Sequence, residues 1–154
     1  MKTDDLERRL AQKQAQLSAL REIGRAINAA LELQATLELI TRKTADVMGM
    51  DSCSIYLLDD EGTCLVLGAT TGLSKEAIGE ARLELGEGLT GWAAEQEEAV
   101  GVADAAQDPR FKHLPETRES IFQSLLAVPL VNQGRVIGAM NVQTERHHAY
   151  EDDE

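Results

Sequence analysis

The sequence has few of the residues from which disulfide scaffolds and metal sites are built. It contains two cysteines and three histidines among 154 residues, and aromatic residues make up only 3%. Two cysteines are too few for a disulfide scaffold, and neither cysteine nor histidine occurs with the spacing of a metal site. We therefore expect no metal ion and no other cofactor.

Basic charge and long apolar runs are also scarce. The chain has 15 Lys and Arg residues against 27 Asp and Glu residues, a formal net charge of −12 at pH 7. Such a charge repels nucleic acid and anionic membrane surfaces. No apolar run approaches the roughly 20 residues that span a bilayer, and the N-terminal segment lacks the apolar stretch of a signal peptide. We therefore expect a cytoplasmic protein without nucleic-acid or membrane partners.

The two cysteines lie on strands that we predict to form one hairpin. Residues 52–58 and 63–71 are apolar and rich in β-branched residues, and the DDEG sequence at 59–62 favours a turn between them. In that register Cys64 lies opposite about residue 58, so Cys53 is about 17 Å further along the strand. A disulfide needs Cα atoms within about 7 Å of each other, and we expect two separate thiols.

Residues 4 to about 30 have the pattern of a long helix with one narrow apolar face. Six apolar residues recur close to heptad spacing and predict a coiled-coil seam: Leu6, Leu10, Leu17, Leu20, Ile27 and Leu31. So narrow a face suits a partner helix better than a globular core. We favour a parallel homodimer through this helix; the alternative is a solvated helix that lies on its own domain.

The remaining residues have the pattern of an α+β domain. A second helix is predicted over 34–48, because Gly49 is typical of the position after a helix. A strong hairpin pattern covers 125–144, and Pro129 within it implies a bulge or a sheet edge. Between the helix and this hairpin we predict a hairpin over 52–71, short strands at 81–85 and 99–103, and a short helix at 89–96. The order predicts a central antiparallel sheet with helices on one face and loops over the other.

One long polar connection, residues 104–120, contains two of the three prolines. Connections of this length without clear structure are usually functional or mobile, and we predict at most a helical turn near 116–121. The scarce aromatic residues Tyr56, Trp92, Phe111 and Phe122 surround the face that this connection covers. Each one alone is a reasonable core residue, but together they are typical of a small-molecule pocket.

The GEGLTG sequence at 86–91 matches the glycine pattern of dinucleotide-binding loops. That fingerprint needs a buried parallel strand before it and a full crossover helix after it. Here the preceding run is short and half charged, and the following helix is too short for a crossover. We predict instead a tight turn that begins a helix, with the free amides of Leu89 and Thr90 able to hold a carboxylate or phosphate of a ligand.

No constellation of catalytic residues is visible. Ser54, Ser120 and Ser124 lack the G-x-S-x-G context of a hydrolase nucleophile. Acidic residues are numerous but scattered, and we interpret most of them as solvated. Asp108 and Arg110 flank Pro109, where a local ion pair is favoured over a ligand contact.

Five segments of the chain are distinctive when taken together and in order: 52–59 (SCSIYLLD), 86–91 (GEGLTG), 104–111 (DA and DPRF), 124–130 (SLLAVPL) and 138–143 (GAMNVQ). They resemble a GAF domain, the small-molecule sensor module of phosphodiesterases, histidine kinases and related bacterial regulators. The resemblance runs from about Leu20 to Asp153, and 108–121 is also similar to the sensory domain of nitrogen-branch phosphoenolpyruvate phosphotransferases.

The resemblance implies a sheet of five to six strands, terminal helices on one face and a ligand pocket on the other. It divides the chain into a signalling helix over 1–31 and a sensor domain over 32–154 that lacks the family's C-terminal helix. The Asn-Lys-Phe-Asp-Glu set of cyclic-nucleotide binders and the cysteine of bilin binders are both missing, so neither ligand is expected. By resemblance the pocket draws on Ser54, Tyr56, Leu89, Thr90, Trp92, Phe111, Ile121 and Phe122.

The sequence thus predicts a non-catalytic, dimeric sensory domain that binds a small molecule and regulates an effector absent from this chain. Two alternatives remain. One is a dimerisation module with a collapsed pocket. The other is a thiol-based free methionine sulfoxide reductase, for which Cys53 and Cys64 are poorly placed because such chemistry needs neighbouring, accessible thiols.

Overall fold

The computed structural model describes residues 1–154, apart from the side chain of Ser120. The chain divides into two compact parts, residues 1–36 and 37–154. One helix, α1 (Lys2–Met48), supplies the whole first part and the beginning of the second. The prediction of separate helices over 4–30 and 34–48 was therefore wrong. Residues 31–36 contain neither glycine nor proline and are mostly Leu, Glu, Gln and Ala, which propagate a helix.

The first part exposes the predicted seam. All six seam residues, from Leu6 to Leu31, are more than half exposed. Exposed leucines at heptad spacing are what an unpaired coiled-coil strand presents. The seam as a dimer contact, and the division at 31/32, stay predictions. Among the described residues, no helix is both long and apolar enough to cross a membrane.

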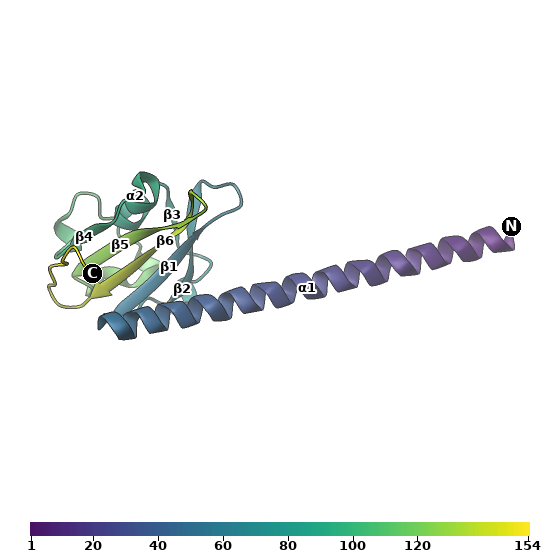
Figure 1. The fold of residues 1–154 in the computed structure, drawn as a ribbon, viewed down its shortest axis with the longest axis horizontal. Helices are drawn as coiled ribbons and strands as arrows, with labels where there is room; N and C mark the ends of the chain where they lie inside the picture. The colour runs from purple at the N-terminus through teal and green to yellow at the C-terminus, as the bar shows by residue number, and fades with distance from the viewer. The chain divides into compact units, whose positions relative to one another are not determined.

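The second part is built on one six-stranded sheet in the order β3-β2-β1-β6-β5-β4, in which every neighbouring pair is antiparallel. This confirms the predicted α+β fold (Figure 1). The strands are β1 (Ser52–Leu58), β2 (Cys64–Thr70), β3 (Arg82–Glu84), β4 (Val100–Val102), β5 (Ser124–Asn132) and β6 (Arg135–Thr144).

Alternation along the central strands separates the two faces of the sheet. One face packs Cys53 and Ile55 of β1 against Leu37 and Ala45 of α1. The other face packs Tyr56 and its neighbours beneath α2 (Gly88–Gln96), the short 3₁₀ turn η1 (Lys75–Ala77) and the β4–β5 connection. Helix α2 and the last turns of α1 thus lie on opposite faces (Figure 1).

Both cysteines are free, as predicted. Leu58 pairs with Leu65, and the Asp59 amide donates to the Cys64 carbonyl at 2.8 Å, so Cys64 lies opposite Asp59, one residue from the expected position. Pro129 also behaves as predicted. Strand β4 pairs with β5 only from Leu125 to Ala127, so Pro129 lies on a free edge, and the β5–β6 register shifts just after it.

Candidate functional site

The connection between β4 and β5, residues 103–123, forms a cover over the Tyr56 face of the sheet. It contains three 3₁₀ turns, η2 (Ala105–Gln107), η3 (Pro115–Thr117) and η4 (Glu119–Ile121). The last two confirm the helical turn predicted near 116–121. Buried Thr117 anchors the middle of this covering segment, because its hydroxyl donates to the Leu114 carbonyl at 2.7 Å and its carbonyl accepts from the Ser74 amide at 2.9 Å.

A small cavity of about 10 Å³ lies beneath the covering segment. That is about the space of one water molecule. Four residues predicted from the sequence, Tyr56, Leu89, Thr90 and Phe111, line it together. The full lining is Tyr56, Leu83, Gly88, Leu89, Thr90, Phe111, Lys112, Leu114, Glu119 and Leu125.

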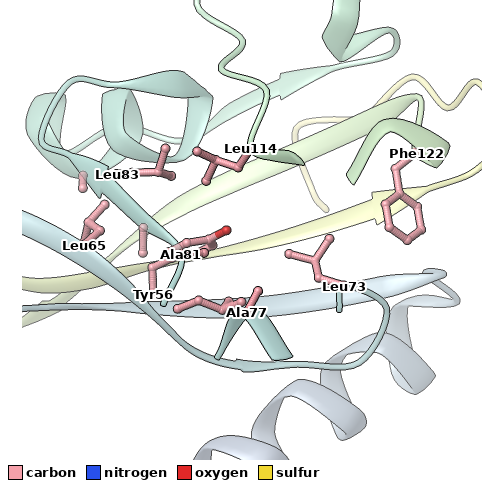
Figure 2. Close-up of a cluster of buried hydrophobic side chains, with 11 residues drawn as sticks. Tyr56, Leu65, Leu73, Ala77, Ala81, Leu83, Leu114 and Phe122 are labelled. Carbon is pink, nitrogen blue, oxygen red and sulfur yellow. The ribbon is translucent and has the colours of Figure 1, made fainter. Parts of the chain in front are cut away.

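The other four predicted residues lie outside this lining. Ser54 is buried on the Tyr56 face and shares a hydrogen bond of 2.8 Å with Thr70. Phe122 is buried in the same apolar cluster as Tyr56 (Figure 2), and Trp92 packs beside Leu89 in a second cluster. Ile121 is 55% exposed, because the tight η4 turn directs Glu119 and Phe122 inward instead.

Sequence reasoning missed six of the ten lining residues, and Glu119 is the buried titratable one among them. Only 6% of it is exposed, and Gln143 Nε2 donates to its Oε1 at 3.1 Å. Burial raises the pKa of the Glu119 carboxyl to about 7, and the hydrogen bond from Gln143 offsets part of that rise. Glu119 stands in the polar run ETRES, where no periodicity distinguishes it from its solvated neighbours.

Tyr56 presents the second buried titratable group of the cavity wall. Its side chain lies beneath Leu83 and Leu114 (Figure 2) and is 1% exposed. Burial raises the pKa of the hydroxyl, and the negative charges of Glu119 and then Glu116 raise it further. Tyr56 therefore stays protonated, as a hydroxyl able to donate or accept a hydrogen bond.

Four buried polar residues run along β1 and β6 on this face, and we call them the polar strip: Ser52 and Gln143 pair across the strands, as do Ser54 and Asn141. Asn141 Nδ2 donates to Thr90 Oγ1 at 2.9 Å. Three strip oxygens, Ser52 Oγ, Asn141 Oδ1 and Gln143 Oε1, are buried without a partner among the described residues. Buried polar atoms are rarely left unpaired unless water or a ligand satisfies them.

The glycine motif forms the start of α2, as predicted. A Cβ at Gly91 would lie 2.7 Å from the Glu84 carbonyl oxygen, so only glycine fits between α2 and β3. Because β3 is antiparallel to β2, the motif does not belong to the parallel unit of a dinucleotide-binding fold. The first amides of a helix have no partner within it, and the residues that carry them here, Gly88 to Thr90, line the cavity.

Asp108 and Arg110 form the predicted local ion pair. Arg110 Nε and Nη2 donate to the two Asp108 carboxyl oxygens at 2.9 and 2.8 Å, and this bond lowers the pKa of Asp108. The Arg110 guanidinium also lies 4.7 Å from the centre of the Trp92 ring, a cation–π geometry. The pair thereby joins the covering segment to α2.

Neither cysteine lines the cavity. Cys53 lies on the opposite face, packed with Ala45 and Val142, and burial raises the pKa of its thiol to about 12. Cys64 lies at the start of β2, beside the hairpin turn. A thiol must ionise to act as a nucleophile, so the buried Cys53 is chemically inert at neutral pH.

Comparisons with known proteins agree with this architecture. The GAF domain family model matches residues 30–154. The GAF domain of a phosphoenolpyruvate-protein phosphotransferase from Coxiella burnetii superposes with a TM-score of 0.73 and 35% identity, covering 89% of this chain and 82% of that one. A free methionine-R-sulfoxide reductase from Neisseria meningitidis superposes with a TM-score of 0.63 and 25% identity, covering 77% and 66% of the two chains.

A curated relative, the Nif-specific regulatory protein of Azospirillum lipoferum, is 29% identical over 130 residues, which cover 82% of this chain. The matched region is 21% of the length of this regulator and 16% of the length of another curated relative, a phosphoenolpyruvate-dependent phosphotransferase system protein of Escherichia coli. The match to the family model extends over more than half of the chain. The chain belongs to the GAF domain family.

Proposed function

We propose that this chain is a sensory domain that binds a small polar molecule under its covering segment and regulates an attached effector. The observation that carries the proposal is the polar strip. Three buried oxygens there lack partners, and Asn141 and Gln143 are hydrogen-bonded to the cavity-lining residues Thr90 and Glu119. Unpaired buried polar groups beside a cavity are typical of a binding site whose ligand is not bound.

The cavity of about 10 Å³ holds no more than a water molecule. A metabolite therefore needs the covering segment to move outward, and binding selects that open state. The first amides of α2 favour an anionic group of the ligand at that end of the site. Residues 37–48 of α1 pack on the far face of the same sheet, so a rearranged sheet changes the surface on which α1 rests.

The relatives support a regulatory role, because the chain resembles the GAF domain of a phosphotransferase and part of a Nif-specific regulator. We propose that the effector of this chain is likewise a separate domain, and that the seam on α1 joins two copies.

A thermal-shift screen of polar metabolites tests the proposal. A ligand at 100 times its dissociation constant adds about 2.7 kcal/mol to the free energy of unfolding, which moves the melting temperature by several degrees. A hit must lose its effect in Thr90→Val, which removes the hydroxyl bordering the cavity, and keep it in Thr63→Val at the exposed hairpin turn. A broad library without any such hit overturns the proposal.

The alternative is a dimerisation module with a collapsed pocket. This alternative predicts that no metabolite raises the melting temperature. The small size of the cavity and the burial of Phe122 favour this second candidate. The reductase alternative finds no support in the thiol positions, since Cys53 lies across the sheet from the cavity. Loss of a measurable reductase activity in Cys53→Ser with Cys64→Ser would reverse that judgement.

A further inference from the structure

Three buried oxygens of the polar strip have no partner in the described part of the chain, and two of them belong to amides that donate to the cavity-lining residues Thr90 and Glu119. Asn141 Oδ1, Gln143 Oε1 and Ser52 Oγ are buried and unpaired among the described residues. Glu119 adds a carboxyl group whose one hydrogen bond there comes from a neutral amide, Gln143 Nε2. Each amide nitrogen of the strip donates one hydrogen bond, since Asn141 Nδ2 donates to Thr90 Oγ1. A ligand group that brings hydrogen-bond donors to the Glu119 end of the site therefore meets buried acceptors.

The Glu119 carboxyl also lacks a positive partner. The ion pairs of the described residues are Arg110 with Asp108 and His148 with Glu154, and neither involves Glu119. Lys112 is the one basic residue in the lining, and it is exposed. The Tyr56 hydroxyl on β1 and the Glu116 carboxyl on η3, whose negative charge acts on Tyr56, are not cations either. A buried carboxylate is costly unless a cation pairs with it.

Size and charge restrict what can supply that cation. An ammonium group is close to a water molecule in size and donates three hydrogen bonds, so it matches a cavity of about 10 Å³. The net charge of −12 favours the approach of cations. A guanidinium or a quaternary ammonium head is larger than the cavity.

We propose that the Glu119 carboxylate is the counter-ion for a primary ammonium group of the ligand, so that this site selects amines. The inference rests on the proposed function and names the chemical group at the Glu119 end of the site. Tyr56 lines the same cavity, and its hydroxyl is a further acceptor for this group. The remainder of the ligand extends toward the covering segment, where Leu114 and Phe111 must move aside.

Proton linkage gives the amine a distinctive pH dependence. With a pKa of about 7, Glu119 is about 9% ionised at pH 6 and about 91% ionised at pH 8. An ammonium group binds the ionised form, so its apparent affinity rises about tenfold from pH 6 to pH 8. Binding also lowers the pKa of Glu119, since an opposite charge favours the ionised carboxyl.

The probe is methylammonium chloride, with tetramethylammonium chloride at equal ionic strength as the control that has the same charge but no N–H donor. Carbon-13 NMR of the full chain follows the Glu119 carboxyl through a pH titration. Methylammonium is expected to lower the pKa of Glu119 in a saturable manner, and tetramethylammonium is expected to leave it unchanged. An unchanged Glu119 pKa at saturating probe, the result of a site that holds only water, overturns the proposal.

Variants give an independent readout by thermal shift. Glu119→Gln is expected to abolish the stabilisation by methylammonium at pH 8, and the matched exposed variant Glu116→Gln is expected to keep it.

If Lys112 rather than a ligand pairs with Glu119, Lys112→Met raises the pKa of Glu119 without any probe, and that result also overturns the proposal. A metabolite hit that lacks an amine and ignores Glu119→Gln refutes this inference and leaves the proposed function intact. The converse, a response to methylammonium without any metabolite hit, refutes the proposed function alone.

Discussion

Thr90 at the first turn of α2 and Asn141 on β6 are joined by a hydrogen bond of 2.9 Å, although 51 residues separate them in the chain. Both residues are buried. The bond fixes the beginning of α2 above the sheet, and therefore fixes one wall of the cavity. It is also the only hydrogen bond that the structure gives either side chain in the described part of the chain.

Thr90→Val keeps the shape of the side chain and removes this hydroxyl. We expect the free energy of unfolding to fall by about 1–3 kcal/mol, because Asn141 Nδ2 is left buried without an acceptor. Urea denaturation measures the change, with Thr63→Val at an exposed turn position as the control. Equal stability of the two variants would show that the bond contributes nothing to the fold.

Glu119 gives the protein a pH dependence opposite to that of a salt-bridged carboxylate. Its pKa rises from 4.5 to about 7 on folding, so between these values the folded chain holds a proton that the unfolded chain has released. Stability is therefore complete below pH 4.5 and falls as the pH rises through 7. The loss amounts to about 3 kcal/mol, since one pKa unit corresponds to about 1.4 kcal/mol.

Glu119→Gln resembles the protonated side chain at every pH. Its amide oxygen can keep the hydrogen bond from Gln143 Nε2. We expect it to match the wild type near pH 4.5 and to be more stable than the wild type at pH 8, as measured by urea denaturation at both pH values. The exposed Glu116→Gln is the control, and equal stabilities of wild type and Glu119→Gln at pH 8 would contradict the buried state of this carboxyl.

The sheet was predictable because its strands carry strong local patterns. The hairpin at 125–144 has apolar runs around a polar turn. Pro129 indicated a bulge or a sheet edge, and the structure has a free edge at Pro129 and a register shift just after it. The continuity of α1 was not predicted, because the narrow seam ends at Leu31 and the face that packs on the sheet begins at Leu37. Residues 31–36 carry this change of pattern without containing any residue that ends a helix.

The site was predictable only in part. Tyr56, Leu89, Thr90 and Phe111 were identified from aromatic residues and a helix start, features that a sequence displays. Glu119 is buried by the path of two 3₁₀ turns, and such turns have no long period that reveals an inward position. Ile121, two residues later, points outward for the same reason.

Two glycines give opposite predictions when changed to alanine. At Gly91 the added methyl group meets the Glu84 carbonyl oxygen at 2.7 Å, whereas at Gly24 within α1 it meets nothing within 4 Å. We expect Gly91→Ala to destabilise the protein by about 1–3 kcal/mol through overpacking. Gly24→Ala is expected to raise the helicity of α1, because alanine is favoured over glycine in a helix by about 1 kcal/mol. Urea denaturation measures the stability of Gly91→Ala, and far-ultraviolet circular dichroism measures the helicity of Gly24→Ala. Unchanged stability of Gly91→Ala would show that β3 can shift to make room for the methyl group at little cost.

The seam on α1 predicts the oligomeric state. Leu17 and Leu20 are both more than half exposed and occupy neighbouring seam positions. Replacing both by aspartate places charges where a parallel partner helix would pack, and we expect the dimer to dissociate into monomers in sedimentation equilibrium. Ser18→Asp, on the outer face of the same helical turn, controls for the helix propensity of aspartate and is expected to remain dimeric. A wild-type chain that sediments as a monomer at every concentration tested would remove the seam from the proposed mechanism and leave the cavity to act within a single copy.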